Sequence, residues 1–99
     1  MQMVFPCKII PEKVGGYSVI FPDIAGGTQG ATLFEALAMA DDFANFAVSS
    51  ALEDGDAIPK PSPIEKIELK AGELLQLVRV DTEEYRKRTA QVEQAKGAA

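Results

Sequence analysis

The fold of this chain is decided by two neighbouring stretches, Gly15-Gly16-Tyr17-Ser18-Val19-Ile20-Phe21-Pro22-Asp23-Ile24 and Thr32-Leu33-Phe34-Glu35-Ala36-Leu37-Ala38-Met39-Ala40. In the first stretch, large apolar side chains recur at every second position after two glycines, which is the pattern of a turn followed by a β-strand. Pro22 ends this strand because proline cannot donate to a ladder of hydrogen bonds. In the second stretch, Thr32 can cap a helix, and Glu35 completes a capping box three residues later. The sequence therefore predicts the second arm of a hairpin, a loop and a helix.

Three further strands are expected around this unit. The segment Met3–Pro11 alternates as a first strand, in which Pro6 favours an edge position or a bulge. A short third strand is limited to Thr28–Gln29 because Gly30 breaks it. A late strand over Leu74–Val80 alternates again and returns to the sheet after the helix.

The central helix is predicted from Leu33 to Asp54, with Gly55 as its stop. Its apolar stripe contains Leu33, Ala36, Leu37, Ala40, Phe43, Ala44, Ala47, Val48 and Ala51. The opposite side carries mostly Glu35, Asp41, Asp42, Asn45, Ser49 and Glu53. Met39 and Phe46 lie side by side off the stripe, either as peripheral core under a loop or as an interface for a second protomer or partner. We expect a homodimer or homotetramer, because one helix cannot cover all the apolar positions.

The segment after the helix is an extended connector. It contains Pro59, Pro61 and Pro63, whose alternation stiffens the chain. After the late strand, either Asp81 or Thr82 can cap a last helix. The predicted order is therefore β-β-β-α-β-α.

The pattern of residues in the two stretches resembles that of the HicB antitoxin family, the partner half of HicA–HicB toxin–antitoxin pairs. The family's hallmark is a strand G-x-Y-x-V-x-F-P-D, a loop ending T-x-G, and a helix T-L-x-E-A-L-x-x-A. The matching residues are Gly15 or Gly16, Tyr17, Val19, Phe21, Pro22, Asp23, Gly26, Thr28, Gly30, Thr32, Leu33, Glu35, Ala36, Leu37 and Ala40. The resemblance runs roughly from Val4 to Arg88. One departure is a residue missing around Gly26–Thr28, which implies a third strand that starts late or is distorted.

The resemblance implies an α+β fold, a partial ribonuclease H-like domain. A three- to four-stranded antiparallel sheet would have one long helix packed on one face. It also implies an antitoxin, or an antitoxin-like binding module, that neutralises a small basic HicA-type RNase toxin by direct protein binding. The net charge of −5 and the pI of about 4.6 suit a basic partner, because opposite charges speed encounter. We place the toxin contacts on the acidic residues of the long helix, Glu35, Asp41, Asp42 and Glu53.

Members of the family usually carry a C-terminal DNA-binding module, a helix-turn-helix or a ribbon-helix-helix. Here residues 1–88 form the HicB-like domain, and residues 89–99 leave only a short helical tail without an apparent DNA-binding module. This length argues against DNA binding by the chain. Either the protein lacks the module or the chain has been shortened.

Composition sets the remaining limits. The chain has 99 residues, 46% of them hydrophobic, which suits a single folded domain. The single Cys7 cannot form an internal disulfide and is expected as a small buried side chain. There is no signal-peptide pattern and no apolar run of about 20 residues, so we expect a cytoplasmic protein without a membrane segment.

The alternative function is a degenerate ribonuclease H-like RNA-binding protein or a weak metal-dependent nuclease, since that fold works with clustered carboxylates on metal ions. The candidate metal ligands are Asp23, Glu35 and Asp42. Each has a simpler interpretation, as a turn residue, a helix cap and part of a solvated face. The chain has no histidine, the commonest general base, so we expect no catalytic residue, no cofactor and no enzyme activity. A third hypothesis is a stand-alone oligomeric scaffold.

One group of basic residues could bind nucleic acid. The group consists of Arg79, Arg86, Lys87 and Arg88. RNA remains a partner under the alternative function. The competing interpretation is ordinary pairing of these cations with Glu83 and Glu84 along the last helix.

Overall fold

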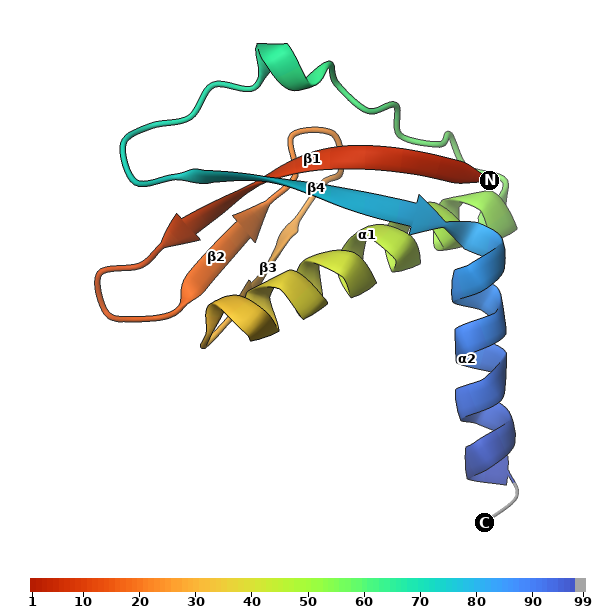
Figure 1. Ribbon diagram of the computed structural model, residues 1–99. Coiled ribbons are helices and arrows are strands. Elements are labelled where there is room, and N and C mark those ends of the chain that lie inside the picture. The colour runs from red at the N-terminus through yellow and green to blue at the C-terminus, as the bar shows by residue number, and fades with distance from the viewer. Residues whose placement is uncertain (98–99) are drawn as a thin grey trace.

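Four antiparallel strands form one sheet in the order β3-β2-β1-β4 (Figure 1). The strands are β1 (Gln2–Pro11), β2 (Tyr17–Ile20), β3 (Gly27–Gly30) and β4 (Leu74–Asp81). The computed structural model describes the backbone of residues 1–97 and the side chains of residues 1–90. The α+β class and the order β-β-β-α-β-α predicted from the sequence are confirmed.

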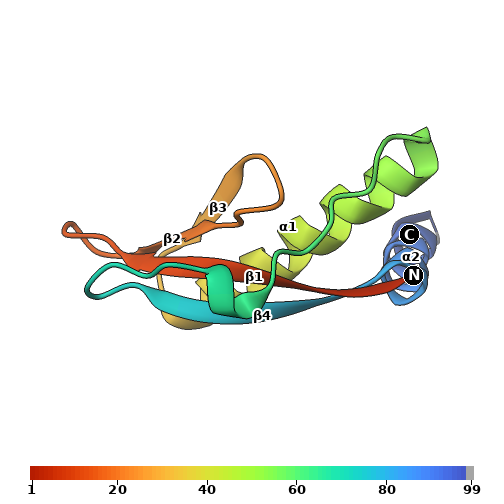
Figure 2. The same ribbon diagram turned by 90° about the horizontal axis from the view of Figure 1, so that it is seen from above.

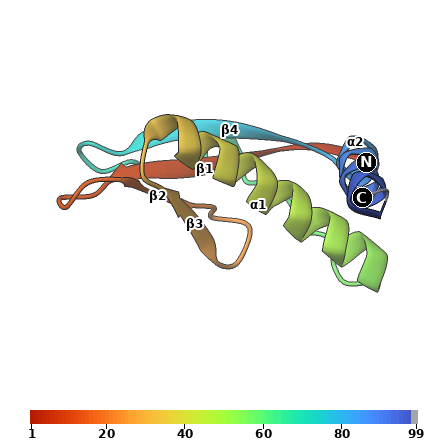
Figure 3. The same ribbon diagram turned by 90° about the horizontal axis from the view of Figure 1, so that it is seen from below.

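The long helix α1 (Leu33–Asp54) crosses one face of the sheet, and the connector to β4 runs along the other face (Figures 1, 2 and 3). The bounds of α1 are those predicted. Thr32 Oγ1 accepts a hydrogen bond from the backbone N–H of Glu35 at 3.1 Å, as in a capping box. The carboxylate of Glu35 accepts from the N–H of Ala31, one residue before the usual partner, at 3.4 Å. Gly55 ends the helix in the left-handed region, with φ of 71°.

The core lies between α1 and the sheet. Its residues are Phe5, Cys7, Ile9, Val19, Phe21, Ile24, Ala36, Ala40, Ala44, Val48, Val78 and Val80. Small side chains on α1 let the helix approach the sheet closely. At Gly30 the helix comes so close that an added Cβ would lie 2.3 Å from the backbone nitrogen of Ala36. Gly30 therefore belongs to β3, opposite Tyr17. The prediction that Gly30 breaks this strand was wrong.

A second expectation about the strands was wrong, and a third was confirmed. The third strand spans Gly27–Gly30 in regular register with β2, so it is neither late nor distorted. Although β1 lies between β2 and β4, Pro6 itself has an edge position, one of the two alternatives expected. The proline is accommodated because the pairing of β1 with β2 covers only Lys8 to Pro11, so at Pro6 the only neighbouring strand is β4.

The predicted apolar stripe of α1 is only partly buried. The buried line runs through Ala36, Ala40, Ala44 and Val48. Leu33 and Leu37 stay 40% and 36% exposed. Asn45, placed on the polar side by the sequence, is instead 3% exposed. The core line of α1 is therefore shifted towards the side of Asn45.

The last helix, α2 (Thr82–Gly97), follows β4 directly and points away from the sheet (Figure 1). Asp81 caps it, since its carboxylate accepts from the N–H groups of Glu83 and Glu84 at 3.1 Å each. The hydrogen bond from Glu84, followed by one from Gln2, holds the pKa of Asp81 below its usual range. The boundary expected between residues 88 and 89 falls within α2. Within residues 1–97, neither helix is long and apolar enough to cross a membrane.

Candidate partner-binding surface

One line of side chains runs along the face of α1 that points away from the core. It contains Glu35, Met39, Asp42, Phe46 and Glu53, which we call the outer stripe. At 3.6 residues per turn these positions fall within about 60° of one another around the helix. All five are exposed, including 41% of Met39 and 59% of Phe46. The structure therefore joins on one surface residues that the sequence had assigned to two separate interfaces.

All the charged residues of α1 are acidic. α1 contains five carboxylates and no lysine or arginine. Glu53 and Asp54 lie in its last turn, where the negative end of the helix dipole disfavours a negative charge. These two acids therefore do not stabilise the helix. Two large apolar side chains among carboxylates give such a surface both area and charge.

The outer stripe continues into a groove between the two helices. The groove has a volume of about 760 Å³, with Phe46 and Glu53 on one wall and Tyr85 and Arg86 on the other. Ser49 also lines it, and the Oγ of Ser49 is buried without a hydrogen-bond partner among the described residues.

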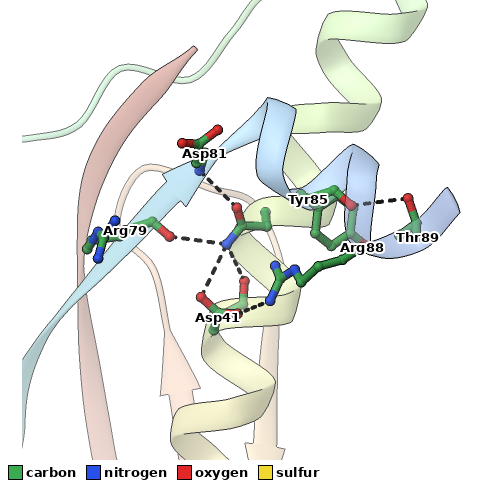
Figure 4. Close-up of polar contacts among 7 residues, drawn as sticks. Asp41, Arg79, Asp81, Tyr85, Arg88 and Thr89 are labelled. Atoms are coloured by element: carbon green, nitrogen blue, oxygen red, sulfur yellow. Dashed lines mark hydrogen bonds and ion pairs between the residues drawn. The ribbon is translucent and has the colours of Figure 1, made fainter. Parts of the chain in front are cut away.

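Asp41 is separated from the other predicted toxin contacts. Its carboxylate faces α2 and lies 3.4 Å from Nη1 of Arg88 (Figure 4). Both side chains are about half exposed, so this ion pair adds little to stability. Arg88 also lies over the ring of Tyr85, at 5.4 Å from the centroid. The carboxylate of Asp41 is thus directed to α2 and not to the outer stripe.

Asn45 is the polar residue that sequence reasoning missed. Its Nδ2 donates to the carbonyl oxygens of Asp41, at 2.8 Å, and Arg79, at 3.1 Å. Its Oδ1 accepts from the N–H of Asp81 at 3.1 Å (Figure 4). One amide therefore joins α1 to the outer edge of β4. A possible signal was its place beside Ala44 and Val48, but helical periodicity alone could not separate it from the solvated side.

The candidate metal ligands do not come together. Asp23 accepts two hydrogen bonds from Ser62, from the N–H at 2.8 Å and from Oγ at 2.5 Å, and so anchors the connector. Glu35 serves the start of α1, and Asp42 lies exposed on the outer stripe. Among the side chains of residues 1–90, no three carboxylates or thiols gather closely enough to hold a metal ion.

The candidate nucleic-acid residues lie on two elements. Arg79 is exposed on the face of β4 opposite Val78 and Val80, and Arg86, Lys87 and Arg88 are exposed on α2. Among the described side chains the ion pairs are Lys8–Glu73 and Arg88–Asp41. The pairing of these cations with Glu83 and Glu84 expected from the sequence is therefore not formed in the structure.

The comparisons with known proteins agree on one family. The family model described as HicB-like antitoxin of bacterial toxin–antitoxin systems matches residues 5–95. The chain is 44% identical over 64 residues to antitoxin HicB 1 of Photorhabdus laumondii, covering 64% of this chain and 41% of that protein. It is 41% identical over 63 residues to antitoxin HicB of Escherichia coli K12, covering 63% and 46%. The chain thus matches less than half the length of these curated relatives.

Two solved structures are similar. One is a chain of a toxin–antitoxin complex from Streptococcus pneumoniae, with a TM-score of 0.74 and 25% identity over 86% of this chain and 73% of that chain. The other is a chain of the HicA3 and HicB3 toxin–antitoxin complex, with a TM-score of 0.64 and 23% identity over 80% and 99%. The second likeness concerns the fold alone.

Proposed function

Because the chain belongs to the HicB-like antitoxin family, we propose that it is an antitoxin module that neutralises a small basic HicA-type RNase toxin by direct binding. The relatives named antitoxin and the solved toxin–antitoxin complexes support this partner. We assign the function to the α+β domain at residues 1–88, which carries α1, and we place its action in the cytoplasm. The module acts by binding and not by catalysis.

The observation that carries the proposal is the outer stripe of α1. A toxin that cleaves RNA must itself present cations to phosphate groups. The carboxylates of Glu35, Asp42 and Glu53 offer such cations a competing anionic surface. In binding them the antitoxin occupies the surface on which RNA would lie, and the toxin is blocked without any change in its catalytic residues.

Met39 and Phe46 supply the apolar part of this interface. Phe46 is 59% exposed, and large aromatic side chains at the centre of an interface are frequent hot spots. Truncation of such a residue typically costs about 2 kcal/mol or more, roughly a thirtyfold loss in affinity. The charged residues should act more on the association rate and on its dependence on salt.

The first test is co-expression of the chain with the short basic reading frame encoded next to it. We expect a complex that co-purifies and restores growth. A purified complex then allows the affinity to be measured by calorimetry for Phe46→Ala and for the double variant Asp42→Asn/Glu53→Gln. The matched control is Glu65→Gln/Glu68→Gln, which removes the same charge from exposed positions of the connector.

We expect the outer-stripe variants to lose at least tenfold in affinity and the control to remain within about twofold. Absence of any complex with the basic neighbour would refute the antitoxin function. A complex that both double variants weaken equally would refute only the place of the interface. The alternative of a metal-dependent nuclease has no comparable support, because the oxygens of Asp23 are engaged by Ser62.

A further inference from the structure

The outer edge of β4 has a short segment without a neighbouring strand. β4 is an edge strand and pairs only with β1. In an antiparallel strand, the N–H and C=O groups of alternate residues point to the same edge. The bonds of Asn45 with Arg79 and Asp81 lie on the outer edge, so Leu75 and Leu77 direct their backbone groups there as well. Among the described residues, the side chain of Gln76 reaches the oxygen of Leu77 at 3.2 Å, and no other strand lies there.

The side chains around this segment are apolar and exposed. Leu74, Leu75 and Leu77 are 47%, 36% and 43% exposed. On α1, Leu37 borders a groove of about 300 Å³ with Gln76 and Leu77. Phe34, which lies on the same side of α1 as Asn45, is 85% exposed. An exposed apolar edge strand of this kind readily pairs with a strand of another chain.

We propose that a second copy of this chain pairs with this edge, so that two β4 strands join antiparallel across a twofold axis at Gln76. Leu75 of one copy then exchanges backbone hydrogen bonds with Leu77 of the partner subunit, and the reverse pair does the same. The dimer has one continuous sheet of eight strands.

The symmetry of the free segment singles out a second copy. Asn45 closes the edge from Arg79 onwards, and β4 begins at Leu74, which leaves the segment 74–78. Gln76 is its centre, so the segment is complementary to itself in one antiparallel register. The segment also carries no charge, so two acidic copies do not repel one another there, and it offers a basic toxin no opposite charge.

This dimer leaves the outer stripe free. Around α1, Phe34 and Asn45 face the β4 edge, whereas Met39, Asp42 and Phe46 lie about 60–140° further around the helix. The patch of Met39 and Phe46, predicted from the sequence as an oligomer interface, is then available to the toxin. Self-association and toxin binding can therefore be tested independently.

The test is the mass of the full chain in solution, measured by light scattering after size exclusion from about 10 to 300 µM. One copy has a mass of 10.6 kDa, and we expect a species of twice this mass. The variant Leu75→Lys/Leu77→Lys places like charges opposite each other across the axis and should give a folded monomer, with folding checked by circular dichroism. The control Val14→Lys/Leu69→Lys adds the same charge at exposed positions outside β4 and should remain a dimer.

A second measurement fixes the register. Directly opposite residues of a non-hydrogen-bonded pair have Cα atoms about 4.5 Å apart, which a disulfide can span. In a Cys7→Ser background, which removes the thiol directly opposite position 76 on β1, Gln76→Cys should therefore form an intermolecular disulfide under mild oxidation, whereas Thr28→Cys on the opposite edge strand should not.

A monomeric wild-type chain at the highest concentration would overturn the proposal. A double-lysine variant that stays dimeric, or a thiol at position 76 that does not cross-link, would do the same and point to another interface. A monomer whose toxin binding is abolished by the double-lysine change would assign the edge to the toxin.

Discussion

Replacement of Asn45 is the sharpest test of how α1 is joined to the sheet. The substitution Asn45→Ala removes an amide that is 3% exposed and leaves the carbonyl of Arg79 and the N–H of Asp81 without their partner. Neither backbone group has another partner within the sheet, because both point to the outer edge of β4, where no neighbouring strand lies. The energetic cost therefore depends on whether water can reach the two groups.

The magnitude follows from these two hydrogen bonds. Each contributes about 0.5–1.5 kcal/mol net when water replaces the lost partner, and about 1–3 kcal/mol when the freed group stays dry. The site is partly buried, so we expect Asn45→Ala to lower the free energy of unfolding by about 2–4 kcal/mol. For a domain of this size, each kcal/mol lowers the midpoint temperature by roughly 4–8 °C.

Urea unfolding followed by circular dichroism measures this loss, with Asp42→Ala as the exposed control on the same helix.

The isosteric Asn45→Asp adds a test by pH. A carboxylate there faces the carboxylate of Asp41 and the carbonyl of Arg79, so its pKa should be raised in the folded state. The stability of this variant should be higher below the ordinary pKa of aspartate and should fall as the pH rises. A loss below 1 kcal/mol for Asn45→Ala, with no pH dependence for Asn45→Asp, would refute the bridging role.

Three other predictions concern single sites. Gly30→Ala should destabilise the domain by about 1–3 kcal/mol in the same assay, because the added methyl group would lie against the backbone of Ala36; an unchanged midpoint would contradict this close approach. Burial raises the pKa of Cys7 to about 11, so a thiol reagent at pH 8 should react only after unfolding, and rapid labelling of the native protein would contradict the burial. The N–H of Glu84 lowers the pKa of Asp81, so the cap of α2 contributes stability above the ordinary pKa of aspartate and loses it as the pH falls. Asp81→Ala should remove this acid-dependent step and reduce helicity at neutral pH, which circular dichroism measures.

The elements fixed by local chemistry were predictable from the sequence. The helix over Leu33–Asp54 has its bounds where Thr32 caps it and Gly55 stops it, because both signals act within one turn. The strands followed from alternation, and the family from the spacing of the motif. The short third strand was underestimated, since a sequence cannot show that Gly30 is there for the approach of α1.

The side of α1 that becomes buried was not predictable from the helical periodicity of its apolar residues alone. A helical wheel assigns Asn45 to the polar half, but at Asn45 the helix reaches the outer edge of β4, where two backbone groups need partners. The same limit applies to Pro6, whose tolerance depends on where the neighbouring strand β2 stops. Both outcomes depend on which strand lies at an edge, and that is decided by tertiary contacts.

The hydrogen bonds of Asn45 also explain how the free edge of this domain can accept an added strand in one register only. An edge strand that was open along its whole length could accept many strands in many registers, which leads to aggregation. Asn45 closes the end of β4 at Arg79 and Asp81, so any added strand is confined to the segment 74–78. A partner that shifts by two residues loses half of the outward backbone groups offered by Leu75 and Leu77. A single buried amide thus limits the edge to one register, and loss of Asn45 should broaden the association of the chain as well as weaken its fold.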